Sequence, residues 1–335
     1  MHTEAALSYR SVNVDFPTVD GSIRILRDVD LDVPKGSIVV LAGESGSGKS
    51  TAMLSAARLL PWGAEIDGEI LIDGSDVSCL STGKLRRLRS RTMRVIFQDP
   101  WSSMHPMIRI GKQLIESARQ AHPDWSKRQL HDLCVETLEK VGIPEPRARM
   151  KSYAHQVSGG QLQRIVIAMC LVAEPEILLC DEPTTALDVT TQQQILDLLV
   201  DLNRRLGVTI VLSTHDISVI RGIADYLAVM YAGTVVEFGP AMQVLGEPQH
   251  PYTWALLESA PERAEGGKRL TTIEGRPPRA GIAHSGCSFA ERCTAARDMC
   301  REQQVSLLPI TTGRQTACVR VQQRLLAHRP SEVIV

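Results

Sequence analysis

The chain has 335 residues, enough for one large domain with an appendage or for two domains. Hydrophobic residues make up 43% of it and charged residues 22%, which predicts a packed globular core. A net charge of −1 and only 4% aromatic residues provide neither the basic field nor the stacking platforms typical of nucleic-acid-binding proteins, so we expect no nucleic-acid partner.

The first residues, MHTEAALSYRSVNVDF, contain no apolar run behind a basic segment, so we expect no signal peptide. No stretch of the chain approaches the roughly 20 apolar residues that a membrane-spanning helix needs. We therefore expect a cytosolic chain that reaches a membrane only through partner proteins. In the cytosol thiols stay reduced and disulfides are rare.

Three strands and a helix are predicted before residue 61. Polar and apolar residues alternate twice in residues 5–35, on either side of the turn sequence PTVDG, which predicts an antiparallel pair. SIVVLAG, residues 37–43, predicts a short buried strand. A Gly/Ser loop then leads into the helix KSTAMLSAARLL, which we expect Pro61 to end.

A densely basic segment, residues 84–94, follows. We interpret it as a solvated helix face with Leu85 and Leu88 turned inward, in preference to an anion site. Residues 99–157 lose the β pattern and contain helical stretches such as KRQLHDLCVETLEKVG. This segment is expected to form a helical subdomain.

Strand and helix patterns alternate again in the second half of the chain. EILLCDEP, QQQILDLLVDLNRRLG and TIVLSTHD predict a parallel sheet with crossover helices. YLAVMYAGTVVEFGP predicts two short strands joined at Ala232–Gly233. The periodicity then weakens and Pro and Gly become frequent, so we expect one domain over residues 1–245 and a C-terminal extension over residues 246–335.

The sequence GESGSGKS, Gly43 to Ser50, matches the phosphate loop G-x-x-x-x-G-K-S in full and lies between a predicted strand and a predicted helix. Its glycines allow successive N–H groups to face a phosphate, and the helix N-terminus adds partial positive charge. We expect Lys49 to reach the β- and γ-phosphates and the Ser50 hydroxyl to bind Mg²⁺. The alternative, a flexible Gly/Ser turn, is disfavoured by this context.

Two acidic residues end the apolar strand of EILLCDEP. Asp181 is the candidate for Mg²⁺, held through water, and Glu182 is the candidate general base for an attacking water. An Asp–Glu pair at a strand end is weak evidence alone, because acids often cap the next helix. Behind a phosphate loop it is strong evidence for nucleotide hydrolysis.

A second helix start with an anion-binding pattern lies in VSGGQLQR, residues 157–164. Ser158 could be an ordinary N-cap, or the two glycines could offer N–H groups to an anion. One nucleotide does not need two such helix ends. The pattern is accounted for if the second end closes on a nucleotide that another subunit holds.

The order phosphate loop, FQDP, SGGQ, LLCDEPTTALD and STHD resembles the ATP-binding cassette of ABC transporters over roughly residues 5–245. The resemblance implies an α/β fold: an ABC-type P-loop NTPase core with an antiparallel β subdomain, a helical subdomain at about residues 99–157 and a small cysteine-containing extension. It also implies the substrate ATP and the cofactor Mg²⁺. The residues expected to contact the nucleotide through the phosphate loop are Gly43, Ser45, Gly46, Gly48, Lys49, Ser50 and Thr51.

The same resemblance assigns roles to further positions. Gln98 is implied to be the lid-loop glutamine that senses γ-phosphate and Mg²⁺, and His215 the switch histidine on γ-phosphate. Phe16 is the first candidate to stack on adenine, with Tyr9 as the alternative. The signature that grips ATP across a dimer is implied to be Ser158, Gly159, Gly160 and Gln161, with Asp188 in the loop that crosses between subunits. Val157 stands where Leu is usual in this signature.

HPYTWALLESAP, IEGRPP and the cysteines that follow resemble the ATP-binding subunits of oligopeptide and dipeptide importers. That resemblance implies a second cassette subunit, often non-identical, two membrane permeases, and an external binding protein. The chain would lie peripherally on the cytoplasmic face of the inner or plasma membrane, with residues 99–157 facing the permeases. WSSMHP, Trp101 to Pro106, departs from the usual form of its loop at Met104 and His105.

Several alternatives stay open from the sequence. The cargo could also be nickel, glutathione, an opine or an oligosaccharide, because a cassette does not touch cargo. A soluble ABC ATPase of DNA repair, translation or iron–sulfur assembly is the second class. The proteins of DNA repair and translation typically carry two cassettes or a long coiled-coil insertion, and a basic face, none of which this sequence indicates. The iron–sulfur assembly ATPases are compact and would not need an extension over residues 246–335. A non-enzymatic binding module is disfavoured by the complete set of hydrolytic residues.

Four of the eight cysteines lie in the last fifty residues, in CSFAERCTAARDMC and just beyond. Reduced thiols this close in sequence usually serve a metal or redox chemistry. Their spacings, with five, six and seventeen intervening residues, fit neither the C-x₂-C pairs of structural zinc sites nor the ferredoxin runs. The spacing therefore predicts four thiolates and no particular metal.

Resemblance to importer subunits with this tail implies a structural [4Fe–4S] cluster, with zinc, disulfides or free thiols as alternatives. The implied ligands are Cys287, Cys293, Cys300 and Cys318. The remaining cysteines are expected to be ordinary buried thiols: Cys79, Cys134, Cys170 and Cys180.

Overall fold

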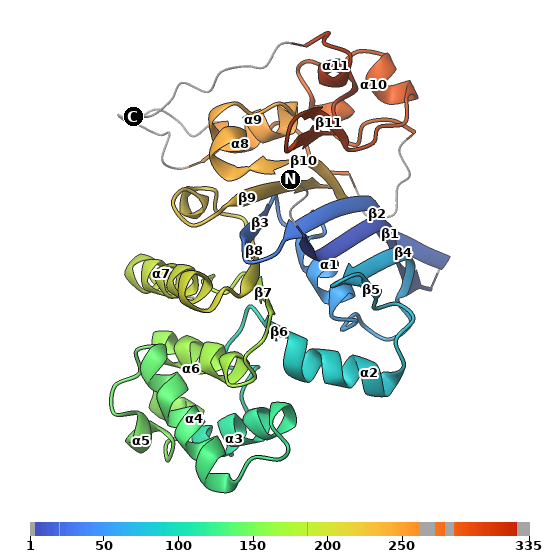
Figure 1. Ribbon diagram of the computed structural model, residues 1–335. Helices are drawn as coiled ribbons and strands as arrows, with labels where there is room; N and C mark the ends of the chain where they lie inside the picture. Colours follow the sequence, from blue (N-terminus) through green and yellow to red (C-terminus); the bar gives the residue numbers. More distant parts are fainter. Residues whose placement is uncertain (1–3, 20, 186, 261–271, 279–284, 327–335) are drawn as a thin grey trace. The chain divides into compact units, whose positions relative to one another are not determined.

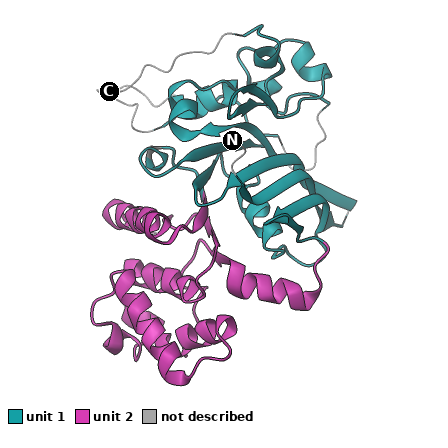
Figure 2. Ribbon diagram, viewed as in Figure 1, with its two compact units in different colours: residues 1–78, 213–335 teal, residues 79–212 magenta. Residues whose placement is uncertain are grey.

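The computed structural model describes residues 4–19, 21–185, 187–260, 272–278 and 285–326 (Figure 1). The chain forms two compact units (Figure 2). Unit 1 contains residues 1–78 and 213–335, and unit 2 contains residues 79–212. The predicted α/β fold is confirmed, with antiparallel and parallel strands and helices in the expected order.

The first sheet of unit 1 is antiparallel, as the alternation in residues 5–35 predicts. Its strands lie in the order β2-β1-β4-β5. Their bounds are β1 Ala5–Thr18, β2 Gly21–Pro34, β4 Glu65–Ile72 and β5 Ser75–Asp76. Residues 6–9 and 12–14 of β1 are buried, and the hydroxyl of Tyr9 donates a hydrogen bond of 2.8 Å to the Ala52 carbonyl of helix α1 (Lys49–Ala56).

Helix α1 ends earlier than predicted, at Ala56 instead of just before Pro61. Arg58 adopts a left-handed conformation with φ of 49°. The N–H of Arg58 donates to the Ser55 carbonyl and the N–H of Leu59 to the Leu54 carbonyl, the hydrogen-bond pair of a Schellman end. The backbone therefore terminates this helix before the proline is reached.

The second sheet of unit 1 begins with the buried strand β3 (Ile38–Ala42), parallel to β9 (Tyr226–Tyr231). β9 pairs antiparallel with β10 (Thr234–Pro240) through the predicted turn Ala232–Gly233. A side chain at Gly233 is excluded, because its Cβ would lie 2.0 Å from the Ile25 carbonyl oxygen of β2.

The C-terminal extension adds to this sheet. β12 (Arg314–Thr316) pairs with β10 and with β11 (Leu308–Thr311), which gives the order β11-β12-β10-β9-β3. The fully buried Glu237 of β10 binds Arg314 of β12 at 3.0 Å. The short helices of this region are α8 Ala241–Gly246, α9 Pro251–Glu258, η6 Ala290–Arg292, α10 Met299–Glu302 and α11 Val319–Gln322.

Unit 2 is mostly helical, as predicted for its middle part. Its strands β6 (Met93–Ile96) and β7 (Ile177–Asp181) run parallel, with Ile96 opposite Cys180. The helices are α2 Thr82–Arg87, η1 Leu88–Thr92, α3 Ile110–Ala121, α4 Lys127–Lys140, α5 Pro146–Arg149, η2 Ala154–Gln156, α6 Gly159–Leu171 and α7 Val189–Leu206. β8 (Thr209–Thr214) crosses the boundary between the units in sequence.

The sequence predicted a single helix face over the basic segment 84–94, and this prediction is wrong. The segment contains part of α2, the π-helical turn η1, and the first two residues of β6. Leu85 is buried as expected and Leu88 is half-buried. The chain passes from helix to strand within this segment. Its many basic residues obscure that transition in the sequence pattern. Within the described residues, no helix is both long and apolar enough to cross a membrane.

Candidate functional site

The phosphate loop of unit 1 is folded around its own lysine. The Lys49 side chain is buried, and its Nζ donates to the carbonyl oxygens of Gly43 at 2.8 Å and Glu44 at 3.1 Å. Gly43 must be glycine, because a Cβ there would lie 2.2 Å from the Met230 carbonyl oxygen of β9. Gly48, at φ 103°, is the N-cap of α1. The predicted strand–loop–helix context is therefore present.

The rim of the loop is open to solvent, since Ser45, Gly46 and Ser50 are exposed and Thr51 is half-buried. Ser47 is buried, and its hydroxyl has no hydrogen-bond partner in the part of the chain that the structure describes. The exposed Ser50 oxygen is a donor atom of the type that Mg²⁺ prefers. The loop thus exposes a hydroxyl oxygen of this type at Ser50.

Two predicted hydrolytic residues of unit 2 lie in contact. Gln98 follows β6 and Glu182 follows β7, and Gln98 Nε2 donates to Glu182 Oε2 at 3.3 Å. The Thr185 hydroxyl donates to the same oxygen at 2.9 Å. Glu182 has φ of 43°, a strained backbone for a residue with a side chain. Asp181, the residue before it, ends β7 and is half-buried.

The signature segment of unit 2 begins helix α6, and Ser158 is its N-cap, which is the ordinary alternative that the sequence left open. The Ser158 hydroxyl accepts from the Gln161 N–H at the start of α6, and the Gln161 side chain accepts from the Ser158 N–H. A Cβ on Gly160 would lie 2.5 Å from Thr191 Cγ2, whereas one on Gly159 would make an ordinary contact of 3.8 Å with Leu187. Helix α7 thus approaches the signature closely at Gly160.

Asp188 is the N-cap of α7. Its carboxylate accepts from the Thr191 N–H at 3.0 Å and from the Thr191 hydroxyl at 2.7 Å. These hydrogen bonds, led by the backbone one, hold the pKa of Asp188 below its usual range. Thr191 therefore links the Asp188 loop to the signature helix.

The remaining predicted contacts lie in unit 1. His215 is exposed, one residue past β8. Phe16 is half-buried near the end of β1, opposite Ile23. Tyr9, the alternative for adenine stacking, is buried in the sheet and bonded to Ala52, so it cannot present its ring to a ligand. Lys49, Ser50 and His215 belong to unit 1, and Gln98, Asp181 and Glu182 to unit 2.

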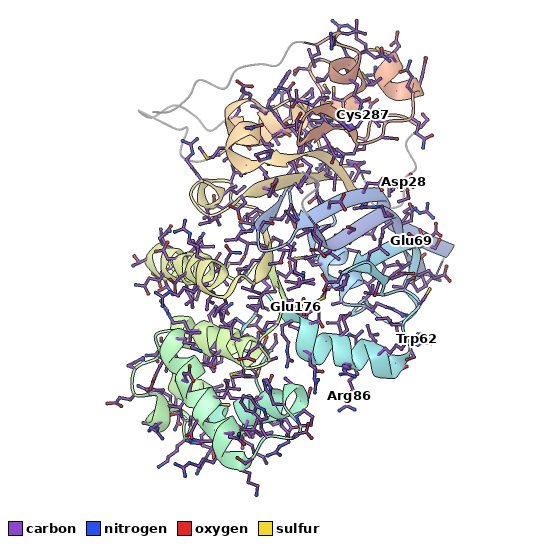
Figure 3. All side chains as sticks on the ribbon, in the orientation of Figure 1. Asp28, Trp62, Glu69, Arg86, Glu176 and Cys287 are labelled. Atoms are coloured by element: carbon purple, nitrogen blue, oxygen red, sulfur yellow. The ribbon has the colours of Figure 1, made fainter. Side chains whose placement is uncertain are left out.

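The four C-terminal thiols converge. A cavity of about 20 Å³ in unit 1 is lined by Cys287, Cys293, Cys300 and Cys318. The Cys287 N–H donates to the Cys300 carbonyl at 2.7 Å. Burial, reinforced by the neighbouring thiols, raises the pKa of Cys287 to about 12. Figure 3 marks Cys287 within the C-terminal extension.

The four C-terminal thiols, which all belong to the described residues, do not form a metal site in this structure. Among the residues that are described, no three His, Cys, Asp or Glu side chains are close enough together to hold a metal ion. The shared cavity shows that the four thiols lie near one another, although they come from separate positions in the sequence. The described residues do not show the ligand arrangement of a metal site.

The other cysteines divide. Cys134, Cys170 and Cys180 are buried as predicted, and burial raises the pKa of Cys134 to about 12 and of Cys170 to about 11. The prediction for Cys79 is wrong: this thiol is exposed, in the turn between β5 and α2. A turn between two short elements offers no core to bury it.

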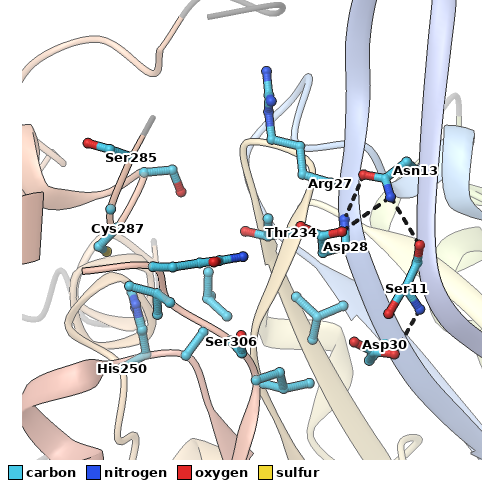
Figure 4. A pocket seen from close by; sticks show the side chains of 18 of the residues that line it. Ser11, Asn13, Arg27, Asp28, Asp30, Thr234, His250, Ser285, Cys287 and Ser306 are labelled. Carbon is cyan, nitrogen blue, oxygen red and sulfur yellow. Dashed lines mark hydrogen bonds between the residues drawn. The ribbon is translucent and has the colours of Figure 1, made fainter. Parts of the chain in front are cut away.

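A cavity of about 430 Å³ lies between the β1–β2 pair and the C-terminal extension of unit 1 (Figure 4). On one wall the Asn13 side chain accepts from the Asp28 N–H at 3.1 Å and donates to the Ser11 carbonyl at 3.0 Å. Cys287 and His250 line the other wall. No phosphate-loop residue is among the described residues that line it, so this cavity is distinct from the nucleotide site.

Sequence reasoning missed one contact of the phosphate loop. Glu44, to which the sequence analysis gave no role, forms a bidentate ion pair with Arg292 of the extension at 2.7 and 3.0 Å. The partners are 248 positions apart, so no local pattern could reveal them. A signal in the sequence that could have drawn attention to Arg292 was its position directly before Cys293, within the cysteine cluster.

Comparisons with known proteins agree with this arrangement. Residues 26–185 match the family model described as ABC transporter, and residues 236–300 match that of the oligopeptide/dipeptide transporter C-terminal region. The dipeptide transport ATP-binding protein DppD of Bacillus subtilis is 43% identical over 299 residues, covering 89% of each chain. The oligopeptide transport ATP-binding protein OppD of Escherichia coli is 39% identical over 323 residues, covering 96% of this chain and 95% of that protein.

Solved structures show the same cassette fold. A bacterial ABC transporter cassette solved as a dimer has a TM-score of 0.62 and 28% identity, covering 70% of this chain and 98% of that one. The cbiO1 protein of Clostridium perfringens, part of an ABC transporter complex, has a TM-score of 0.63 and 27% identity, covering 72% and 90%. With its full set of cassette motifs and relatives of this similarity, the chain belongs to the family of ABC transporter ATP-binding proteins and carries the C-terminal region of the oligopeptide/dipeptide transporters.

Proposed function

We propose that this chain is the ATP-hydrolysing subunit of an importer for oligopeptides or dipeptides. Support comes from the transport function in the names of its relatives and from the matching C-terminal region. The observation that carries the hydrolytic part is the hydrogen bond of 3.3 Å between Gln98 and Glu182, because it joins a positioning amide to a carboxylate directly after Asp181. The phosphate loop supplies the complementary phosphate-binding element.

In the proposed reaction, the phosphate-loop N–H groups and Lys49 bind the phosphates of ATP. Glu182 accepts a proton from water as the water oxygen bonds to the γ-phosphorus and the bond from that phosphorus to the ADP oxygen breaks. Gln98 and His215 orient the water and the γ-phosphate. Bound Mg²⁺ would neutralise phosphate charge, with Ser50, Gln98 and Asp181 as its oxygen donors, directly or through water.

The working unit in this proposal is a pair of cassettes closed by ATP, each signature gripping the nucleotide of the other. The dimeric structure of a related cassette supports the pairing. Ser158, Gly159, Gly160 and Gln161 would contact the partner's ATP, and Asp188 would lie in the crossing loop. By family resemblance the partner is a non-identical cassette subunit. Phe16 would stack on adenine, since Tyr9 is buried.

The proposal places the chain peripherally on the cytoplasmic face of the membrane, below two permease subunits that receive cargo from an external binding protein. Residues 99–157 would contact the permeases. In the loop that departs from the usual form, Met104 is buried and His105 is exposed, so His105 is the one available to tune partner choice. Nickel, glutathione, opine or oligosaccharide import is the alternative with the same machinery.

We further propose that the four C-terminal thiols hold a [4Fe–4S] cluster with a structural role, with zinc as the alternative. The donor set fits, because all four thiols line one cavity and are largely withdrawn from solvent. Burial raises the pKa of Cys287, Cys293 and Cys318, so a bound cation is needed to keep them as thiolates. The thiols would have to rearrange around the cavity of about 20 Å³ to ligate a cluster, because no three ligand side chains of the described residues are arranged to hold a metal ion.

The experiment for the transport role is purification of the chain with its co-expressed permeases, followed by a ligand screen on the cognate binding protein. Binding of peptides, and stimulation of ATP hydrolysis by the peptide-loaded binding protein, is expected. Stimulation by nickel, glutathione or a sugar instead would replace the cargo and keep the ATPase. Failure of the chain to associate with any permease would favour a soluble ABC ATPase.

A further inference from the structure

The phosphate loop is tied to the C-terminal extension at Glu44, the second residue of GESGSGKS. Both carboxylate oxygens of Glu44 accept hydrogen bonds from the Arg292 guanidinium, at 2.7 and 3.0 Å. A bidentate pair of this kind fixes orientation as well as distance. The Arg292 side chain is only 5% exposed and that of Glu44 29% exposed, so solvent screens the pair weakly.

Arg292 is itself held in place by its surroundings. Its Nε donates to the Glu274 carbonyl at 2.9 Å, and its NH2 group donates to the Ile273 carbonyl at 3.2 Å. Its guanidinium lies over the rings of Tyr231 and Phe289, at 5.7 and 6.0 Å. The hydrogen bonds to Glu44 raise the pKa of Arg292 above its usual range. The guanidinium is therefore a fixed, permanently charged anchor.

The backbone of Glu44 is held from the same side. Its N–H donates to the Tyr252 hydroxyl at 2.9 Å. The Tyr252 ring is fully buried and packs against Tyr231 at 4.5 Å and against Phe289 at 5.3 Å between ring centroids. The main chain of Glu44 is thus bound by Tyr252 and its side chain by Arg292, and both partners pack on the rings of Tyr231 and Phe289.

The restraint on Glu44 passes directly to the phosphate-binding lysine. The Glu44 carbonyl is an acceptor of Lys49 Nζ, and it also accepts from the Ser47 N–H at 3.2 Å. A shift of Glu44 would move both groups. We propose that Arg292 is a positioning residue for nucleotide binding, which acts through Glu44 to hold the phosphate loop in the shape that receives ATP phosphates.

This role also explains why the extension carries a folded cysteine segment next to a cassette. Arg292 lies between Cys287 and Cys293, in the turn η6 that these thiols flank. The folded structure of that segment therefore determines where the Arg292 guanidinium lies. The inference rests on nucleotide binding at the phosphate loop, but on neither the cargo nor the identity of a bound metal.

The test measures nucleotide affinity and turnover of full-length variants. Arg292→Ala and Glu44→Gln are each expected to raise the Kd for Mg·ADP, by titration calorimetry, and the KM for ATP about tenfold, since misplacing a binding group by an ångström has effects of this size or larger. The double variant is expected to show no more than either single one, because both changes remove the same contact. Arg292→Lys keeps the charge but cannot form the bidentate pair, so a smaller rise in the Kd for Mg·ADP and in the KM for ATP is expected than for Arg292→Ala.

Two matched arginines provide the controls. Arg314 of the same extension forms a more deeply buried pair with Glu237 of β10, and Arg301 forms an exposed pair with Glu291 of the cysteine segment. Arg314→Ala is expected to lower Tm, and Arg301→Ala to change little, with both nucleotide constants within about twofold of the wild type.

Two results would overturn the role of Arg292. One is an unchanged KM and Kd in folded Arg292→Ala and Arg292→Lys proteins. The other is an equal rise in KM for Arg314→Ala, which would mean that general loosening of the extension, and not the contact with Glu44, affects the loop.

Discussion

Gln98 and Glu182 are 84 positions apart in sequence, yet Gln98 Nε2 lies 3.3 Å from Glu182 Oε2. The parallel pairing of β6 and β7 brings them together, because Ile96 is opposite Cys180 and each functional residue follows within two positions. The Thr185 hydroxyl binds the same carboxylate oxygen at 2.9 Å. These two hydrogen bonds orient the carboxylate.

Glu182→Gln tests the assignment of the general base. The amide cannot accept the proton, so turnover of ATP in the assembled complex is expected to fall by about two or more orders of magnitude while ATP binding is kept. Glu176→Gln is the control, since Glu176 is an exposed acid at the opposite end of β7. Equal hydrolysis by Glu182→Gln and the wild type would remove Glu182 from the mechanism.

Gln98→Ala tests whether the amide acts through Glu182. The variant loses an orienting donor but keeps the base, so kcat is expected to fall about tenfold, less than for Glu182→Gln. In the double variant the two losses should not add, because the residues act as a unit. Steady-state ATPase rates of the four proteins decide this. Fully additive losses would show that Gln98 acts independently of Glu182.

Phe16 and Tyr9 are distinguished by opposite effects. Tyr9→Phe removes the buried hydrogen bond to the Ala52 carbonyl, so the free energy of unfolding is expected to fall by about 1 kcal/mol with KM for ATP unchanged. Phe16→Ala removes a half-buried ring, and a rise in KM for ATP of about tenfold is expected if the ring stacks on adenine. Thermal melts and ATP titrations give both quantities. A rise in KM for Tyr9→Phe without one for Phe16→Ala would reverse the assignment.

Gly160→Ala tests the close approach of α6 and α7. The new methyl would lie 2.5 Å from Thr191 Cγ2, which cannot rotate away without breaking the hydrogen bond between the Thr191 hydroxyl and Asp188. A loss of about 1–3 kcal/mol in the free energy of unfolding is expected. Gly159→Ala, which meets Leu187 at 3.8 Å, is the matched control and should fold normally.

A rescue variant makes the same test specific. Thr191→Ser removes Cγ2 and keeps the hydroxyl on Asp188, so it should restore most of the stability lost in Gly160→Ala. No recovery in the double variant, by denaturant unfolding, would show that the methyl of Thr191 is not the cause.

The cysteine cluster is tested by metal content. Anaerobically purified protein is expected to contain iron and acid-labile sulfide in equal amounts and to absorb in the visible range, and Cys293→Ser should lose both. Cys79→Ser is the control, because Cys79 is exposed and lies outside the extension. A colourless protein with stoichiometric zinc would replace the cluster by a zinc site. Neither metal, with Cys287 and Cys300 freely alkylated in the native protein, would exclude both.

The phosphate loop, the Asp181–Glu182 strand end and the signature were predictable from sequence because each is a local pattern tied to one strand or helix boundary. The antiparallel pair of residues 5–35 was predictable for the same reason. The early end of α1 at Ala56 was not, since it depends on a left-handed backbone at Arg58 rather than on a proline. The prediction of one helix over residues 84–94 was wrong, because a high density of charge does not indicate where the chain changes from helix to strand β6.

Contacts between residues far apart in the sequence could not be predicted from it. The pairing of Arg292 with Glu44 depends on how the extension folds beside β9, and the burial of Tyr9 on which face of β1 meets α1. Both are properties of tertiary packing, which no spacing of residues along one chain expresses. The domain boundary at residue 246 stays a prediction, although β12 joins the extension to the sheet through β10.

The central claim is that this chain converts ATP hydrolysis into peptide import. Uptake of a labelled peptide into proteoliposomes that contain the permeases, both cassettes and the binding protein tests it most directly. With ATP supplied on the cassette side, uptake is expected for the wild type and none is expected for Glu182→Gln, which binds ATP without turning it over. Uptake that continues at the wild-type rate with Glu182→Gln, or a complex that hydrolyses ATP yet accumulates no peptide, would contradict the account.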